Sequence, residues 1–274
     1  MFKAMICAIA GASAIVAAAF ALLFLFQRPL IYPAPAQPPT GVPAGTTPVT
    51  LRTEDGLSLR AAHRPAAAGH PTIIFFHGNG DSLHGAGAAT IRLGEQGYGL
   101  LLVEYRGYGG NPGEPSESGL YRDGRAAMAW LAARKIGRDD IVLVGNSLGS
   151  GTAVQMASEG RVAALILISG FTSLSEVVTH HYPWMPARLL LRDRYENRAK
   201  LSRISTSTLV IHGSADTLIP FSHGERLAAA SPHATLLRVR DVGHDLAYLP
   251  VTQIEIGEWL RRLQMPAAPG ILPR

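Results

Sequence analysis

Short apolar segments alternate with amphipathic ones along most of this chain. Six segments are almost wholly apolar and are bounded by turn residues, which predicts buried strands. They are Ile73–Phe76, Leu100–Tyr105, Ile141–Val144, Ala164–Ile168, Thr208–His212 and Thr235–Val239. Apolar residues at helical spacing predict helices at Leu83–Gln96, Glu117–Arg134, Ser147–Ser158, Ser222–Ala230 and Thr252–Leu263. Strands that are apolar on both faces are typical of a parallel sheet that helices cover on each side.

A predicted hairpin precedes this alternation. Val49–Thr53 and Leu57–His63 have the composition of strands, and the turn Glu54-Asp55-Gly56 separates them. A hairpin followed by strand–helix repeats indicates an α/β domain, with a mostly parallel central sheet and helices on both faces, over residues 47–264.

The N-terminal segment Ala4–Phe26 is long and apolar. It carries no charge, and Lys3 and Arg28 bracket it. A helix of this length measures about 35 Å, enough to cross a hydrocarbon core of about 30 Å. The apolar part of a cleavable signal peptide is normally shorter, so the pattern favours an uncleaved transmembrane anchor at residues 4–26. A signal peptide and a buried core helix are the alternatives. The amino terminus and Lys3, weighed against Arg28, place the N-terminus in the cytoplasm and the rest of the chain in an extracytoplasmic position.

Prolines dominate the segment after the anchor. Seven of them between residues 27 and 48 predict an extended spacer at residues 27–46 that lifts the domain off the bilayer. At the other end, residues 265–274 are rich in proline and small side chains, which predicts a disordered tail.

Composition excludes several classes of protein. The 274 residues are 47% apolar and 16% charged, which is enough apolar surface for a large core and excludes intrinsic disorder. The single cysteine, Cys7, excludes a disulfide framework. The formal charge of +5 comes almost entirely from arginine, but no arginine cluster is interleaved with aromatic residues, so we expect no nucleic-acid partner. The oligomeric state is left open.

Gly145-Asn146-Ser147-Leu148-Gly149 matches the G-x-S-x-G pattern of a nucleophilic serine. The motif directly follows the predicted strand Ile141–Val144 and opens a predicted helix. Both Gly145 and Gly149 are needed, because the serine occupies a strained turn that brings the strand and helix backbones close together. An ordinary tight turn with an inert serine is the alternative.

A serine hydroxyl needs a base, and the base needs a group that orients it. In this architecture the chain order is serine, acid, histidine, each on a loop after a strand. Asp216 follows the strand Thr208–His212, and His244 follows the strand Thr235–Val239. These three residues are therefore the predicted catalytic set. Asp241 and Asp245 are rival acids, too close in sequence to reach the far nitrogen of His244 easily.

A second loop has the composition to stabilise an oxyanion. Negative charge that develops on a carbonyl oxygen needs preorganised donors. One expected donor is the backbone N–H of Leu148. The other lies in the loop His77-Gly78-Asn79-Gly80, where glycines let the backbone approach a substrate and the Asn79 N–H is preferred to that of Gly80. We expect His77 to hold this loop by hydrogen bonds, with a second catalytic base as the alternative.

Together these residues make the chain resemble serine hydrolases of the α/β-hydrolase superfamily. More narrowly, it resembles their membrane-anchored branch, which includes bacterial proteins, the eukaryotic bud-emergence-type homologues and serine aminopeptidase-like hydrolase domains. The further shared motifs are Leu30-Ile31-Tyr32-Pro33, Tyr105-Arg106-Gly107-Tyr108-Gly109, Glu117-Ser118-Gly119-Leu120, Asn197-Arg198-Ala199-Lys200-Leu201 and Ile219-Pro220. Asn146 and Ser150 depart from the commonest residues at their positions in this superfamily. These departures weaken the match to one subfamily, but they do not change the mechanism that the resemblance implies.

This resemblance implies the α/β-hydrolase fold, with a short lid at residues 171–203. It also implies a membrane-tethered serine hydrolase that cleaves carboxylic esters or thioesters, lipid-derived acyl groups among the substrates. A serine peptidase or aminopeptidase of the same fold, and a non-catalytic anchored binding module, are the alternatives. No cofactor is expected. No metal site is expected either, because the adjacent pair His180-His181 lacks a third ligand and zinc-binding motifs are absent from the sequence.

Overall fold

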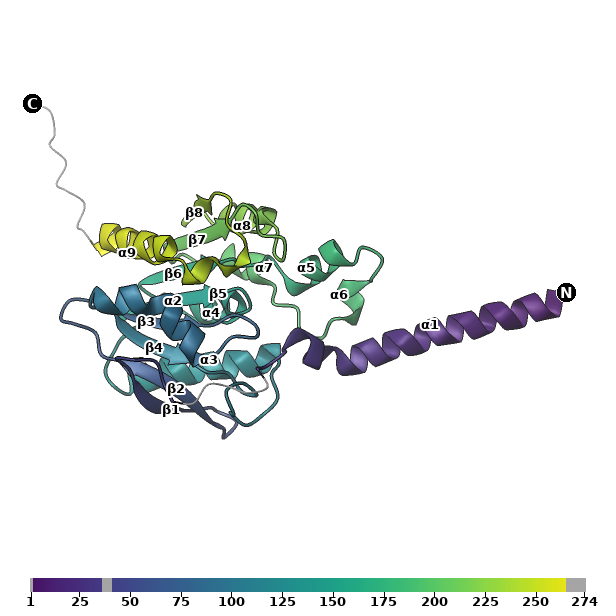
Figure 1. The fold of residues 1–274 in the computed structure, drawn as a ribbon, viewed down its shortest axis with the longest axis horizontal. Helices are drawn as coiled ribbons and strands as arrows, with labels where there is room; N and C mark the ends of the chain where they lie inside the picture. Colours follow the sequence, from purple (N-terminus) through teal and green to yellow (C-terminus); the bar gives the residue numbers. More distant parts are fainter. Residues whose placement is uncertain (1, 36–40, 265–274) are drawn as a thin grey trace, which may run out of the picture.

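The computed structural model describes residues 2–35 and 41–264, so the predicted tail at 265–274 lies outside the described residues. One sheet runs through the body in the order β1-β2-β4-β3-β5-β6-β7-β8 (Figure 1). Its strands are β1 (Thr47–Arg52), β2 (Ser58–Arg64), β3 (Thr72–Phe76), β4 (Gly99–Val103), β5 (Ile141–Asn146), β6 (Ala164–Ile168), β7 (Thr208–Gly213) and β8 (Ala234–Val239). The pairs β1/β2 and β2/β4 are antiparallel and the others parallel, so the predicted hairpin and mostly parallel sheet are confirmed.

The described helices are α1 (Phe2–Ile31), α2 (Leu83–Glu95), α3 (Glu117–Ala132), α4 (Gly149–Ser158), α5 (Leu174–His181), α6 (Ala187–Leu190), α7 (Asn197–Leu201), α8 (Phe221–Ala228) and α9 (Pro250–Gln264). Short 3-10 turns are present at η1 (Arg138–Asp140) and η2 (His244–Tyr248). The five helices predicted inside the domain are all present, each end within two residues of its expected position. The remaining short helices α5, α6 and α7 lie in the predicted lid.

Helices cover both faces of the sheet, as the apolar strands require. Strand β3 shows the arrangement: Ile73 and Phe75 belong to the core on the α2 and α9 side, whereas Ile74 and Phe76 belong to the core on the α3 and α4 side. Because successive side chains of a strand point to opposite faces, a strand buried on both sides is apolar at most of its positions. The result is a three-layer α/β architecture.

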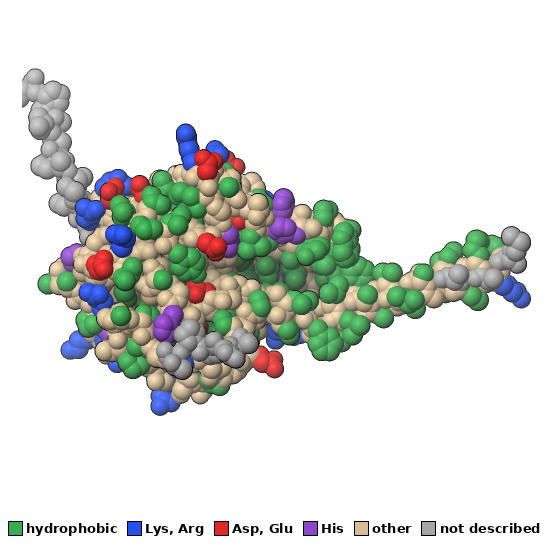
Figure 2. Space-filling view, in the orientation of Figure 1, with side chains coloured by type: hydrophobic (Ala, Val, Ile, Leu, Met, Phe, Trp, Pro, Cys, Tyr) green, Lys and Arg blue, Asp and Glu red, His purple; other side chains and the backbone are tan. Residues whose placement is uncertain are grey.

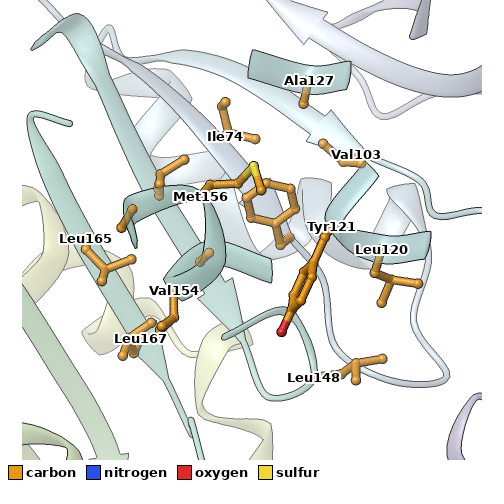
Figure 3. Close-up of a cluster of buried hydrophobic side chains, with 14 of the residues drawn as sticks. Ile74, Val103, Leu120, Tyr121, Ala127, Leu148, Val154, Met156, Leu165 and Leu167 are labelled. Atoms are coloured by element: carbon orange, nitrogen blue, oxygen red, sulfur yellow. The ribbon is translucent and has the colours of Figure 1, made fainter. Parts of the chain in front are cut away.

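The larger core holds α4 in place behind strand β5. Figure 3 shows Val154 and Met156 of α4 against Leu165 and Leu167 of β6, with Leu148 and side chains of α3 in the same cluster. Each such side chain stabilises the fold by roughly 1.5–3 kcal/mol when it is fully buried. The turn between β5 and α4 is therefore fixed from both ends.

Helix α1 projects from the body as an apolar rod whose side chains are exposed (Figures 1 and 2). The expectation that residues 27–46 form an extended spacer is wrong for residues 27–31, which are helical. The helix breaks at Phe26 (φ −109°, ψ 18°) and continues to Ile31. Pro29 is tolerated because it lies in the first turn after the break, where its missing N–H costs no helical hydrogen bond.

The segment after the break is bound to the domain rather than lifted away from it. The Gln27 Nε2 donates to the carbonyl of Leu190 (3.1 Å), and Gln27 Oε1 accepts from the N–H of Arg192 (2.8 Å). Tyr32 is buried, and its hydroxyl contacts Asp193 and Tyr195. On the far side of residues 36–40, which lie outside the described residues, the carbonyl of Gly41 accepts from Arg60. The described residues before and after 36–40 therefore contact the domain.

The predicted lid has two parts. Helices α5 and α6 protrude beside the end of α1, whereas α7 packs against α4 and belongs to the body (Figure 1). From residue 191 to 198 buried and exposed side chains alternate, and the arginines at 192, 194 and 198 are on the exposed side. Their guanidinium groups face solvent, which is the ordinary position for arginine on a packed segment.

Candidate active site

Strand β5 leads into a sharp turn with Ser147 at its apex, and α4 begins at Gly149. Ser147 has a left-handed backbone (φ 49°), a conformation that costs a non-glycine residue about 1–3 kcal/mol. A Cβ on Gly145 would lie 2.5 Å from the carbonyl oxygen of Gly149, and one on Gly149 would lie 2.0 Å from that of Phe76. The two glycines are therefore required by close backbone approach, as predicted for this motif.

Three loops at the carboxyl edge of the sheet bring Ser147, Asp216 and His244 together. His244 Nδ1 lies 2.8 Å from Asp216 Oδ2, and His244 Nε2 lies 2.9 Å from Ser147 Oγ. A carboxylate can only accept, so Nδ1 carries the proton and donates to Asp216, which leaves Nε2 to accept from the serine hydroxyl. Ser147 keeps 9% of its surface exposed, enough for a substrate carbonyl to approach. The arrangement can remove a proton from the serine as it attacks.

The Asp216 carboxylate is held ionised by several donors. Its Oδ1 accepts from the N–H groups of Leu218 (3.0 Å) and Ile219 (2.8 Å). Burial raises the pKa of this carboxyl, but hydrogen bonds from His212, His244 and the Ile219 N–H outweigh burial and hold the pKa well below its usual range. A stable negative charge at this position orients the imidazole and stabilises its protonated form.

The rival acids are placed elsewhere. Asp241 and Asp245 are exposed, and Asp241 occupies a turn with φ 57°. Within the described residues, the carboxylate in contact with the His244 imidazole belongs to Asp216. The 28-residue separation lets a strand and a helix bring acid and base face to face.

The two segments expected to bind an oxyanion flank Ser147. Leu148 follows it at the start of α4, with its side chain buried in the core cluster (Figure 3). On the other side, a Cβ on Gly78 would lie 3.6 Å from the Ser147 Cβ, so the loop of residues 77–80 passes directly against the serine. The Asn79 side chain is engaged: its Nδ2 donates to the carbonyl of Ile31 (2.6 Å) and its Oδ1 accepts from Tyr108 (2.7 Å). Its backbone N–H is the group left for a substrate.

His77 holds this loop from inside the protein. It is fully buried, with Nε2 donating to Glu104 Oε1 (3.0 Å) and Nδ1 donating to the carbonyl of Gly78 (2.8 Å). Burial lowers the pKa of His77, but the hydrogen bond and charge of Glu104 outweigh it, so the pKa is raised. Glu104 Oε2 also accepts from the N–H of Leu83. Both ring nitrogens are used, which fits the predicted supporting role better than a second base.

Sequence reasoning missed three residues that support the site. Glu104 lies inside the predicted strand Leu100–Tyr105, His212 ends the predicted strand Thr208–His212, and Ser169 directly follows the predicted strand Ala164–Ile168. His212 Nε2 donates to the carbonyl of Ile219 (2.8 Å) and lies 3.4 Å from Asp216 Oδ2, while Ser169 Oγ donates to the carbonyl of His244 (3.1 Å). A charged or imidazole side chain inside an otherwise apolar strand was the available signal, because such a group is rarely buried without a partner.

Relatives in sequence support the fold. Residues 71–194 match the family model described as the alpha/beta hydrolase fold. An uncharacterized protein of Mycobacterium tuberculosis (strain ATCC 25618 / H37Rv) is 39% identical over 227 residues, covering 80% of each chain. An uncharacterized protein of Salmonella typhimurium (strain LT2) is 30% identical over 206 residues, covering 68% of this chain and 70% of its own.

Solved structures with a similar fold include esterases. A Pyrococcus furiosus esterase superposes with a TM-score of 0.67 at 20% identity, covering 84% of this chain and 98% of its own. A thermophilic esterase from Thermogutta terrifontis gives a TM-score of 0.61 at 21% identity, covering 80% of this chain and 100% of its own. At this level of identity the likeness establishes the shared architecture and leaves the substrate open.

Proposed function

The chain belongs to the α/β-hydrolase fold family, and from that premise we propose that it is a membrane-tethered serine hydrolase that cleaves carboxylic esters or thioesters. One observation carries the proposal: Ser147, His244 and Asp216 form a continuous hydrogen-bonded series, with an acid that stays ionised. This is the arrangement that makes a serine hydroxyl nucleophilic near neutral pH.

The reaction follows from the geometry. Ser147 Oγ attacks the substrate carbonyl while His244 Nε2 takes its proton, and Asp216 stabilises the imidazolium. The N–H groups of Leu148 and Asn79 bind the oxyanion of the tetrahedral intermediate. The intermediate collapses to an acyl-enzyme as His244 donates its proton to the leaving alcohol or thiol. Water then attacks the acyl-enzyme with His244 again as the base, which releases a carboxylic acid and restores Ser147.

Two observations support the tether. Helix α1 contains a candidate membrane span, Met5–Ile31, whose most apolar window is not buried against the domain, which suits a lipid environment. Gln27 near the end of this helix and Tyr32 just after it bind the domain. Cleavage downstream of Tyr32 would remove buried contacts of the domain, so we favour an uncleaved single-pass anchor with the domain on the extracytoplasmic side.

A fluorophosphonate probe tests the catalytic serine. Wild-type protein in detergent should be labelled, and Ser147→Ala should lose all labelling. Ser150→Ala is the matched control, because this buried serine lies three residues further on, in the first turn of α4, and its loss should leave labelling unchanged. Labelling of folded Ser147→Ala at the wild-type level would refute the assignment. Parallel assays with acyl-ester, thioester and aminoacyl-peptide chromogenic substrates then separate the esterase from the peptidase.

A further inference from the structure

A cavity of about 590 Å³ lies between the end of α1 and the lid. Leu23, Leu30 and Ile31 of α1 form one wall, and Trp184, Met185 and Leu190 are among the residues of the other. We call this cavity the anchor–lid groove. Its volume is in the range of ordinary small-molecule sites, and its lining is mostly apolar.

Gln27 and Tyr182 carry the polar side-chain groups of this lining. Gln27 does not present its amide to a ligand, because it uses its Nε2 on the carbonyls of Phe24 and Leu190, and its Oε1 on the N–H of Arg192. Apart from the Tyr182 hydroxyl, a ligand in the groove would therefore meet mostly hydrocarbon surfaces. Burial of an aliphatic chain there is favourable by about 0.8 kcal/mol for each methylene group.

The mouth of the groove is continuous with the apolar surface of α1. Leu30 is 70% exposed, Trp184 68% and, on the adjoining helix α6, Leu189 81%. Figure 2 shows hydrophobic side chains gathered where the body meets the rod formed by α1. An exposed apolar patch continuous with an apolar helix is typical of a surface that contacts lipid. The groove therefore opens at the level where a bilayer that surrounds α1 would end.

Basic side chains lie beside this mouth. The Arg192 guanidinium lies 5.8 Å from the ring centre of Phe24 on α1, and Arg188 is exposed on α6. Cations at the boundary between an apolar helix and a polar domain suit anionic lipid headgroups, because their stems stay on apolar surface while their charges reach water.

The walls of the groove are hydrogen-bonded to loops that carry the candidate site. On the α1 side, the carbonyl of Ile31 accepts from Asn79 Nδ2, one residue beyond the Gly78 that lies against Ser147. On the lid side, His181, next to the lining residue Tyr182, donates through Nε2 to the carbonyl of Leu218 (2.8 Å), whose own N–H donates to Asp216. The Ile31 wall of the groove is therefore in direct contact with the loop that passes against Ser147.

We propose that the anchor–lid groove holds an acyl chain of a lipid ester that resides in the same bilayer as α1, and that it presents the ester carbonyl to Ser147. The inference rests on the proposed function and specifies its substrate class. The Ser147 Oγ–acyl bond forms as the bond between the acyl carbon and the lipid alcohol oxygen breaks, and that oxygen receives its proton from His244. Water then converts the acyl-enzyme to a free fatty acid.

Groove-filling variants test the proposal by chain length. Full-length protein in liposomes is assayed with a hexadecanoyl umbelliferyl ester in the same vesicles and with the soluble butanoyl ester. Val178→Trp and Met185→Trp each fill the groove, and Ile254→Trp adds the same ring at an exposed position of α9 outside the lining. Loss of contact for about two methylene groups predicts a fall of about tenfold in hexadecanoyl hydrolysis. Butanoyl hydrolysis and all rates of Ile254→Trp should stay within about twofold of wild type.

A loss on both esters, or on neither, with fluorophosphonate labelling intact would overturn the groove assignment. The source of the chain is tested by placing the hexadecanoyl ester in the vesicles that hold the protein, in separate vesicles, or in detergent micelles. The rate should be highest in the shared vesicles. Equal rates in all three arms would overturn the bilayer as the source.

A binding measurement separates this inference from the proposed function. Ser147→Ala protein in liposomes is irradiated with a hexadecanoyl phospholipid that carries a diazirine on its acyl chain. Crosslinks should map to residues 23–31 and 178–191 and should weaken in Met185→Trp. Such crosslinks in a protein whose wild type hydrolyses no ester would retain the groove and refute the hydrolase. Crosslinks confined to residues 2–22, in a protein whose wild type does hydrolyse esters, would retain the hydrolase and refute the groove.

Discussion

The carboxyl edge of the sheet differs from the region where the end of α1 meets the lid, which we call the anchor–lid junction, in which side chains are buried and which are exposed. At the sheet edge, polar groups are buried, and Ser147, Asp216 and His77 each have partners at hydrogen-bond distance. At the junction, large apolar side chains such as Trp184 and Leu189 are exposed, and a few buried polar contacts hold the segments together. Catalysis needs hydrogen-bond donors held in fixed positions. Contact with a lipid surface instead needs exposed apolar area from which water is displaced on binding.

The two regions also differ in how the chain specifies them. Each residue of the sheet edge follows the end of a strand, so the topology of one sheet brings them together. The junction depends on contacts between segments far apart in sequence, such as Tyr32 with Asp193, which are 161 positions apart. We therefore expect substitutions in the first region to abolish chemistry or folding, and those in the second to shift stability and substrate range.

The largest expected effect is on the orienting acid. Asp216→Asn keeps the shape of the side chain but removes the charge that stabilises the imidazolium, so kcat/KM for a short-chain ester should fall about 10³–10⁴-fold. Asp241→Asn and Asp245→Asn are matched controls on the adjacent loop and should stay within about threefold of wild type. A loss at either control as large as that at Asp216 would mean that the acid has been misassigned.

The next effect concerns folding at the same edge. A Cβ on Gly149 would clash with the carbonyl oxygens of Phe76 and His77, which cannot move without displacing β3. Gly149→Ala should lower the free energy of unfolding by about 3 kcal/mol, measured by urea denaturation. Gly137→Ala is the control, because its Cβ would meet nothing nearer than Asp140 at 4.0 Å. If the two variants are equally stable, close packing of the turn is not what requires the glycine.

A smaller effect is expected at the junction. Tyr32→Phe removes the hydroxyl that contacts Asp193 Oδ2 (3.1 Å) and Tyr195 Oη (2.9 Å), which leaves both buried partners one hydrogen bond short. Thermal and urea unfolding should report a loss of about 1–2 kcal/mol. Short-ester hydrolysis should stay within about twofold of wild type, since the sheet edge is untouched. Tyr182→Phe, at an exposed site, should change neither quantity, and a large loss of activity in Tyr32→Phe would show that the two regions are coupled.

The contrast between the regions also explains what the sequence could predict. Strand-end residues such as Ser147, Asp216 and His244 were found because each carries a local pattern, and the β-strand order then brings them together without further information. Gln27 and Tyr32 were placed in an extended spacer because proline spacing was the signal there. Their buried partners lie in the lid, and no local pattern indicates such a contact. His212 and Glu104 were missed for a related reason, because an apolar strand pattern hides the polar group within it.

The smallest expected effect lies where the two regions meet. His223 of α8 is buried beside the start of the lid, where its Nδ1 accepts from the N–H of Thr172 (3.2 Å) and lies 2.8 Å from the Thr172 hydroxyl, which donates to Glu176. Burial, aided by the charge of Arg226 and the nearby rings of His212 and His180, lowers the pKa of His223 to about 4, against the opposing charge of Glu176.

Because this pKa lies below that of a histidine in the unfolded chain, about 6.5, the unfolded state takes up the proton first and acidification favours unfolding. The contribution of His223 to stability is therefore complete above about pH 7 and is lost as the pH falls toward 4. His223→Asn keeps an acceptor for Thr172 but cannot titrate, so its unfolding free energy should fall less over this interval. An identical decline in wild type and variant, measured by urea denaturation at each pH, would place the pH dependence on other groups and leave His223 with a packing role alone.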